Sequence, residues 1–468
     1  MSYAFGPLWV ELAVLAVAGL IFAADLFMGD KRGLGALAAM GLLGVLVASF
    51  FVDLPGLALA DTYIADASSL YFKRVLLLAG ALGCIGSVDF VDRVFPARQG
   101  EHYLLLLFSL SGMLLLTGAQ DLVLWVVGFE LAGLPLALMA AMRKDKRGAE
   151  AGLKLFLAGA ASTAVTLYGV SFLWGSSGGS EFAGLASTAV TPLFALGVLL
   201  VLGGVGFKIG AVPFHLWVAD TYEGAPAPAV AFMSVAPKIA VVASLARLLG
   251  TGLAGHSAIW STPLLALAVI TLLVGNITAV TQQDSRRLLA LSGVGHMGLM
   301  LLALVVGGTE AVAALMFYAL AYVVTNMGAF FTVGLVAERR GGLLRDFDGL
   351  IHSSPSLAVA LLIFLFSLGG IPFLIGFWGK LVLFWAAWLG GYGGVVLLGV
   401  ILSVLALFYY LRLARAMFIQ PSTEPTEVPV GWPSLVAIGL CVALTVGLGL
   451  VPGPFIEAAL EAAATLTP

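Results

Sequence analysis

Six ionisable side chains lie within long apolar stretches of this 468-residue sequence, where such groups are rare. They are Glu130, Lys154, Lys208, Lys238, His296 and Lys380. On membrane-insertion scales, a Lys or Glu at the centre of an apolar helix costs about 2.5–3.5 kcal/mol. Carboxylate, ammonium and imidazole groups share one chemistry, the uptake and release of protons. A row of such groups inside a membrane therefore predicts proton movement.

The depth of these groups within their stretches decides how we interpret them. Glu130, Lys238 and His296 each lie about halfway along a stretch, so we expect them near the middle of the bilayer. A lone buried histidine is usually a core residue, but a histidine in a row of ionisable groups at one depth favours a functional role. Lys154 lies nearer the end of its stretch, where its long side chain could instead extend to the aqueous interface.

Two of the apolar stretches are too long for one simple membrane helix. Residues 190–220 and 355–390 exceed the ~20 residues that cross a bilayer. The residues expected to break the helix are Pro213 in the first stretch and Gly370 and Pro372 in the second. His215, close to Pro213, is a secondary candidate for proton translocation. Interrupted membrane helices persist only where protein or water satisfies the freed backbone groups. A break beside Lys208 or Lys380 therefore brings water to a titratable group; a proline kink used only for packing is the alternative.

The composition restricts the fold class. Hydrophobic residues make up 61% of the chain and charged residues 10%, and the mean hydropathy is +1.10. So few charges could not cover a soluble protein of this size, and long apolar runs predict an all-α polytopic membrane protein. The net charge of −3, with no basic stripe, argues against nucleic acid as a partner. Cys84 and Cys441 lie far apart in apolar runs and predict buried thiols, not a metal site or disulfide.

Apolar stretches of about 20 residues predict about 14 transmembrane helices. The expected spans are 8–28, 34–52, 68–88, 102–118, 120–142, 149–175, 190–220, 226–249, 261–281, 287–308, 310–336, 355–390, 393–419 and 433–452. Beyond the last span, Phe455, Ile456 and Leu460 lie roughly opposite Glu457 and Glu461 on a helical projection. This pattern predicts a short interfacial helix.

Lysine and arginine are unevenly distributed among the loops between these spans. Of the 22 Lys and Arg residues, 15 lie in loops after odd-numbered spans, whereas the even loops and both termini contain only Arg247. By the positive-inside rule, this bias places both termini on the non-cytoplasmic side. Lys73 and Arg74, near the start of the third span, are interpreted as long side chains that extend to the interface.

The two interrupted stretches are related by position. Pro213 and Pro372 are 159 residues apart, and Glu130 and His296 are 166 apart. A five-helix unit used twice explains both spacings, and an odd number of helices makes the two copies inverted. The expected organisation is three N-terminal helices over 1–100, a first repeat over 101–250, an inverted second repeat over 251–420, and a last helix with the interfacial helix over 421–468.

Three segments closely resemble a known family. They are VGFKIGAVPFHLWVADTYEGAPAPAVAFMSVAPK, SLGGIPFLIGFWGK and FYYLRLARAMF. They are similar to the antiporter-like membrane subunits of respiratory complex I, which resemble Mrp sodium/proton antiporter subunits. Within that family the chain most resembles subunit N of bacterial NADH:quinone oxidoreductase. The resemblance covers roughly residues 100–420.

The resemblance implies a role for each of the buried groups. It implies a buried ion pair of Glu130 with Lys208, middle groups Lys238 and His296, a terminal Lys380 on a broken helix, and a Lys154 that can contact the Glu130 region. It also implies a proton-translocating subunit in the bacterial inner membrane, beside other membrane-arm subunits and lipid. No cofactor is expected in this chain; NADH, FMN, iron–sulfur clusters and quinone are expected with partner subunits.

Two other functions remain open at this point. The main alternative is a cation/proton antiporter subunit of Mrp type, or the equivalent subunit of a membrane-bound hydrogenase. A scaffold that has lost transport is the third possibility, and the full set of ionisable residues argues against it.

Overall fold

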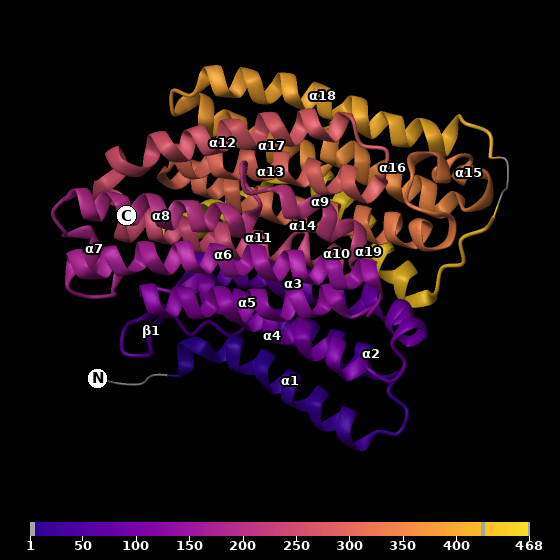
Figure 1. Cartoon of the computed structure of the whole chain (residues 1–468), viewed down its shortest axis with the longest axis horizontal. Coiled ribbons are helices and arrows are strands. Elements are labelled where there is room, and N and C mark those ends of the chain that lie inside the picture. The colour runs from indigo at the N-terminus through magenta and orange to yellow at the C-terminus, as the bar shows by residue number, and fades with distance from the viewer. Residues whose placement is uncertain (1–4, 423–425, 467–468) are drawn as a thin grey trace.

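The computed structural model describes residues 5–422 and 426–466, so the outermost parts of the first and last predicted segments lie outside it. Most helices run side by side along one direction (Figure 1). Within the described residues the only sheet is a small hairpin of β1 (Gly56–Ala58) and β2 (Tyr63–Ala65).

Within the described ranges, twelve helical segments are long and apolar enough to cross a membrane. They comprise α1 (Trp9–Phe27), α3 (Ala67–Val94), α4 (Gln99–Gly118), α5 (Leu122–Ala141), α6 (Lys146–Ser177), α8 (Pro192–Ile209), α10 with α11 (Ala227–Met233 and Ala236–Arg247), α12 (Ser257–Val280), α13 (Ser285–Val306), α14 (Gly308–Arg340), α18 (Gly393–Phe418) and α19 (Trp432–Leu450). Shorter apolar helices are α2 (Leu34–Ala48), α16 (Pro355–Gly369) and α17 (Ile375–Leu389). The chain is therefore an all-α multi-pass membrane protein, while the count of 14 spans stays a prediction.

The remaining helices are short and lie between or after the long ones. They are α7 (Phe182–Ala186), α9 (Leu216–Gly224), α15 (Leu350–Ser353) and α20 (Gly453–Ala463). Helices α10–α11, α13 and α14 are almost wholly enclosed by others, whereas α1, α6 and α18 expose most of their surface. The enclosed helices include those that carry Lys238 and His296, so the structure buries these groups most deeply.

Both long stretches are interrupted, and their helices end in the same way. Helix α8 ends at Ile209 and α16 at Gly369, and a left-handed glycine follows each: Gly210 at φ 69° and Gly370 at φ 88°. A glycine adopts this conformation without the steric cost that a Cβ would bring. The prolines follow within the breaks, so glycine ends each helix and proline prevents it from continuing. The sequence analysis named Gly370 but missed Gly210.

The same hydrogen-bond motif closes both helix ends. The Ala211 N–H donates to the Gly206 carbonyl at 2.8 Å, and the Ile371 N–H donates to the Phe366 carbonyl at 2.9 Å. Each glycine N–H donates to the carbonyl three residues before it. This pairing is the Schellman motif, which satisfies carbonyls that would otherwise be unpaired inside the membrane.

A third interruption was not predicted. The stretch over 226–249 is divided at Ser234 and Val235, between α10 and α11. Two tyrosines cover the freed carbonyls: the Tyr222 hydroxyl donates to Met233 O at 3.2 Å, and the Tyr322 hydroxyl donates to Ser234 O at 3.4 Å.

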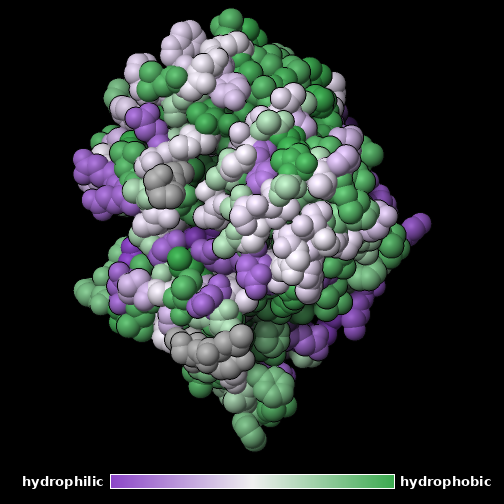
Figure 2. Space-filling view, turned by 90° about the vertical axis from the view of Figure 1, so that its left-hand side faces the viewer, coloured by the Kyte–Doolittle hydropathy of each residue, from purple (hydrophilic) through white to green (hydrophobic). Residues whose placement is uncertain are grey.

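The described chain begins and ends at the same end of the helix bundle, at the left of Figure 1. Near its start, Leu8 packs against Tyr63 of the hairpin. Near its end, the Thr465 hydroxyl accepts a hydrogen bond from the Ser68 N–H at the start of α3. Figure 2 views this end, and hydrophilic residues gather across its middle.

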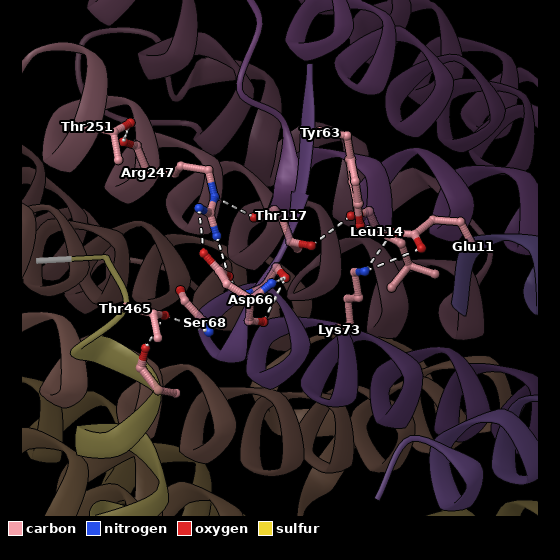
Figure 3. A network of polar contacts seen from close by, with 12 residues as sticks. Glu11, Tyr63, Asp66, Ser68, Lys73, Leu114, Thr117, Arg247, Thr251 and Thr465 are labelled. Carbon is pink, nitrogen blue, oxygen red and sulfur yellow. Dashed lines mark hydrogen bonds and ion pairs between the residues drawn. The ribbon is translucent and has the colours of Figure 1, made fainter. Parts of the chain in front are cut away.

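Arg247, the exception to the charge distribution, does not lie in a solvated loop. Its side chain is buried and donates to both carboxylate oxygens of Asp66 at 2.8 Å each, and to the Thr117 carbonyl at 2.9 Å (Figure 3). Asp66 also caps the N-terminus of α3. The exception is therefore a buried ion pair that joins α11 to α3 and α4.

The interpretation of Lys73 as a side chain that extends to the interface was wrong. Lys73 is 2% exposed and forms an ion pair with Glu11 at 3.1 Å (Figure 3). The Tyr63 hydroxyl donates to the same carboxylate. Arg74 of α3, by contrast, is only part-buried, and it donates to the Ser49 carbonyl at the end of α2. The buried thiols expected for the two cysteines are confirmed.

Candidate functional site

The ion pair expected between Glu130 and Lys208 is present. Lys208, on the last turn of α8, donates through Nζ to Glu130 Oε1 of α5 at 2.9 Å. The Lys208 side chain is 12% exposed and that of Glu130 is 33% exposed. The end of α8 also carries the partial negative charge of the helix dipole, which stabilises a nearby ammonium.

A third group, Thr163 of α6, completes this pair. Its hydroxyl lies 3.1 Å from Lys208 Nζ and contacts Glu130 Oε1. Glu130 and Lys208 border a cavity of about 100 Å³ whose other walls, such as Phe129, Leu155 and Val241, are mostly apolar. Because apolar walls compensate poorly for charge, the acid and the ammonium depend mainly on each other and on Thr163.

Lys154 does not make the expected contact with the Glu130 region. Among the described residues, its Nζ bonds to Asp220 of α9 and to Glu150 of α6, at 2.6 Å each. Asp220 is shared with Arg287 of α13, at 2.7 Å. Lys154 and Thr163 are nine residues apart, which separates this network from the Glu130 pair by about 13 Å along α6. Lys154 therefore holds α9 to α6 and α13.

Lys238 lies on the first turn of α11, directly after the unpredicted break. It is 1% exposed, and its Nζ has no hydrogen-bond partner among the described residues. The nearest favourable group is the face of the Tyr222 ring, whose centroid lies 5.5 Å from Nζ. Gly293 of α13 faces the same Nζ, and a Cβ at this position would lie 2.8 Å from the Tyr322 hydroxyl. The absence of a side chain there makes room for the Tyr322 hydroxyl beside Lys238.

His296 connects the middle of the protein to its second half. Its Nδ1 lies 2.6 Å from the Tyr318 hydroxyl of α14, and its Nε2 lies 3.3 Å from the Tyr410 hydroxyl of α18. Either nitrogen can donate or accept, depending on the tautomer. Two cavities of about 10 Å³ each are lined by both His296 and Lys380. The structure therefore brings these two residues to one small polar region.

Lys380 of α17 spans the second break. Its Nζ donates to the Leu368 carbonyl at 2.8 Å and to the Gly369 carbonyl at 3.3 Å, both at the end of α16. Lys208 does not bond to the carbonyls at its own break, where Trp217 Nε1 instead donates to the Phe207 carbonyl. Lys380 thus combines a titratable group with a structural contact.

His215 lies in the first break, directly before α9. It is partly buried, and its Nδ1 has no hydrogen-bond partner in the described part of the chain. The structure places it with Pro213 in the connection between α8 and α9, away from the contacts of Glu130 and Lys208. No group of three or more His, Cys, Asp or Glu residues within the described ranges forms a candidate metal site.

The chain is similar to known proteins in sequence and in fold. Residues 119–406 match the family described as NADH:quinone oxidoreductase/Mrp antiporter, transmembrane. The chain belongs to this family. It is 37% identical to NADH-quinone oxidoreductase subunit N of Moorella thermoacetica, with 93% of each chain aligned. The resemblance found in the sequence is confirmed.

Solved structures of the NADH:quinone oxidoreductase/Mrp antiporter family agree with the fold. A chain of respiratory complex I from Thermus thermophilus is 30% identical, with a TM-score of 0.81, and the match covers 96% of this chain and 98% of that one. A chain of the Mrp complex from Dietzia sp. has a TM-score of 0.86 at 21% identity, covering 99% and 97%. The second similarity shows a shared fold only.

The sequence analysis missed several residues that contact the candidate groups. Thr163, Tyr318 and Tyr410 are neutral hydroxyl residues in apolar helices, and no sequence signal separated them from other such residues. Asp220 did give a signal, because it is an acid at the end of an overlong apolar stretch. Chemically, the set provides two kinds of unit: a carboxylate, ammonium and hydroxyl cluster, and an imidazole between two phenols. Both can bind and pass protons.

Proposed function

We propose that this chain is the proton-translocating membrane subunit of an NADH:quinone oxidoreductase in a bacterial cell membrane. The observation that carries the proposal is the 2.9 Å pair of Glu130 with Lys208, formed at the end of an interrupted membrane helix. Its similarity to relatives named subunit N, over nearly their full length, supports the choice of host complex. The chain itself performs no redox chemistry.

The pair acts as a switch for the proton on Lys208. An ammonium removed from water is stabilised by a nearby carboxylate, and it loses that stabilisation when the carboxylate moves away. Paired with Glu130, Lys208 holds its proton; separated from it, Lys208 releases the proton. Because Lys154 bonds to Asp220, it is not the alternative partner of Glu130 in this conformation. Thr163 contacts both members of the pair and is placed to follow the change.

The released proton passes through the interior of the protein along the row Lys208, Lys238, His296 and Lys380. Tyr222 lies beside Lys238, and two tyrosine hydroxyls flank His296. The small cavities between His296 and Lys380 hold space for single water molecules. Lys380, at the second break, exchanges the proton with the outer aqueous phase.

The architecture supports the same function. We infer 14 membrane spans, in which α2, the pair α8–α9 and the pair α16–α17 each count as one span. We also infer that the spans include two inverted five-helix repeats. The identical Schellman motifs at Gly210 and Gly370 support this relation. The proposed segments are 1–100, 101–250, 251–420 and 421–468, with both termini outside the cytoplasm. Other membrane-arm subunits are the expected partners, and NADH, FMN, iron–sulfur clusters and quinone belong to the rest of the complex.

A cation/proton antiporter subunit of Mrp type is the second candidate. The observation that favours it is the fold shared with the Mrp complex chain from Dietzia sp.. The two hosts differ in their partners, because only an NADH:quinone oxidoreductase brings NADH-oxidising and quinone-reducing subunits. Affinity purification of this chain from its own membranes, followed by an NADH:quinone reductase assay, separates them. Co-purification with other antiporter-type subunits and without NADH oxidation would favour the second candidate.

The transport role is tested in inverted membrane vesicles, which expose the cytoplasmic face to the medium. Proton uptake is measured beside NADH oxidation and the amount of assembled complex. We expect the Lys208→Ala complex to assemble and to lose most of its coupled proton uptake. Normal uptake in that complex would contradict the role assigned to the pair.

A further inference from the structure

A polar cavity lies at one end of the helix bundle, apart from the row of buried lysines. It has a volume of about 260 Å³ and lies at the end of the bundle opposite the hairpin, where α3, α5 and α14 end. Its polar lining residues are Arg93, Arg143, Glu338 and Arg339. This volume is several times the ~30 Å³ share of one water molecule. The positive-inside bias assigns this end to the cytoplasmic side.

Glu338 differs chemically from every other residue that lines this cavity. Arginine does not release its proton in proteins, and the remaining walls are apolar, so only the carboxylate can exchange a proton with water. The Glu338 side chain is 16% exposed. Its Oε2 accepts from Arg93 at 2.6 Å, whereas Oε1 has no hydrogen-bond partner among the described residues and lies 3.8 Å from Arg143. One carboxylate oxygen is therefore buried at the site with its hydrogen-bonding capacity unused.

A second, narrower cavity continues from this site into the bundle. It has a volume of about 20 Å³ and shares Arg93, Leu335 and Glu338 with the first. It reaches Phe331 of α14 and the start of α10 at Ala227. Asp89 also lines it, but its carboxylate accepts the Ser434 N–H at 2.9 Å and so has a structural role at the start of α19.

Two of the helices that border the narrow cavity, α10 and α14, lead to Lys238. Helix α10 ends at the break that precedes Lys238, and Asn326 of α14 donates to the Ser234 hydroxyl in that break at 2.9 Å. The buried Asn326 Oδ1 has no hydrogen-bond partner among the described residues. Glu338 and Asn326 are twelve residues apart on α14, about 18 Å. Phe331 lies between them, and its ring fills the space beside Gly86.

We propose that Glu338 takes up protons from the cytoplasmic aqueous phase and supplies them to Lys238 through the passage beside Phe331 and Asn326. Arg93 and Arg143 stabilise the ionised form of the carboxylate, and the cavity brings water to the site. A proton bound by Glu338 then leaves along the α10–α14 interface. This inference rests on the proposed function, since Lys238 must require a supply of protons.

The test compares variants of the assembled complex in inverted vesicles. Glu338→Gln removes the exchangeable proton but keeps the shape, Glu338→Asp keeps the acid, and Arg93→Gln breaks the ion pair while keeping Glu338. Glu427→Gln, which removes an exposed carboxylate from the nearby linker, is the matched control. We expect a several-fold loss of coupled proton uptake in Glu338→Gln, a smaller loss in Arg93→Gln, which keeps the acid, and most activity retained in Glu338→Asp and Glu427→Gln.

A purely structural ion pair predicts a different result. Equal losses in Arg93→Gln and Glu338→Gln, without rescue by Glu338→Asp, would overturn the proposal, as would normal uptake in Glu338→Gln. If Glu338→Gln fails to assemble, Leu335→Cys provides an independent readout. A small charged thiol reagent added to inverted vesicles should label this cysteine and block uptake, and absence of labelling would overturn the proposal. If Lys208→Ala loses uptake while Glu338→Gln keeps normal uptake, this inference is refuted and the proposed function is retained.

Discussion

Separating Glu130 from Lys208 provides the sharpest test of the switch. Replacing Glu130 with Ala leaves the Lys208 ammonium with Thr163 as its one hydrogen-bond partner among the described residues. At 2.9 Å, two unit charges interact by about 6 kcal/mol at an effective dielectric of about 20. Since the Glu130 carboxylate is 33% exposed, water screens part of this energy. Breaking a buried pair costs about 3–5 kcal/mol in soluble proteins, and the exposure favours the lower end, about 3 kcal/mol.

Without the carboxylate, the charged form of Lys208 is less favourable, because its ammonium keeps only Thr163 as a hydrogen-bond partner among the described residues. The approach and departure of a carboxylate can then no longer switch the proton on Lys208, so coupled pumping should fall strongly. Glu130→Asp keeps the charge at a longer distance and should have a milder effect.

The assay is proton uptake per quinone reduced in inverted vesicles, with the assembled complex quantified in parallel. Glu130→Ala, Lys208→Ala and the double variant form a cycle. Because the two residues act as a unit, the double variant should pump about as poorly as either single variant. Independent, additive losses would refute the coupling, and wild-type uptake by an assembled Lys208→Ala complex would refute the reasoning as a whole.

Three further predictions follow from the same geometry. Lys380→Arg keeps the charge and the donors to the α16 carbonyls but cannot release a proton, so it should assemble and lose coupled uptake; normal pumping would leave Lys380 a structural role only. Arg247→Met leaves Asp66 charged and unpaired, so it should destabilise the complex by about 3–5 kcal/mol, measured as a lower unfolding temperature in detergent, and Asp66→Asn should recover part of the loss. A single cysteine in the loop 143–148 should react only with reagents on the cytoplasmic side; labelling from outside intact cells would contradict the 14-span topology.

Much of the fold could be predicted because membrane helices depend on composition and length. The breaks within the two overlong stretches could also be predicted from the sequence, since glycine and proline act directly on the backbone conformation. The break at Ser234 was not visible, because Pro237 lies in the first turn of α11, where proline is compatible with a helix. Lys73 was misinterpreted because its partner, Glu11, lies on α1, and only the packed structure brings the two together.

The candidate site could be predicted only as a set of charged residues. Charges in apolar helices are conspicuous because each is costly. Hydroxyl groups such as Thr163 and Tyr318 cost much less, so the groups that complete the site gave no signal. The bond of Lys154 to Asp220 could not be predicted either, because Asp220 lies on α9, whose position depends on how the chain resumes after the break.

The position of each lysine relative to its break explains why the row can be directional. Lys208 lies at the C-terminal end of α8, and Lys380 reaches the C-terminal carbonyls of α16. The dipole at a helix C-terminus stabilises a cation by about 0.3–1 kcal/mol, and the N-terminus destabilises one by a similar amount. Lys238 is the third residue of α11, at the N-terminal end, with no hydrogen-bond partner for Nζ among the described residues. The helix dipoles therefore stabilise a cation at both ends of the row and disfavour one at its centre. In the proposed mechanism, a proton crosses Lys238 only when a change in the neighbouring charges offsets this difference, and separation of Glu130 from Lys208 is such a change.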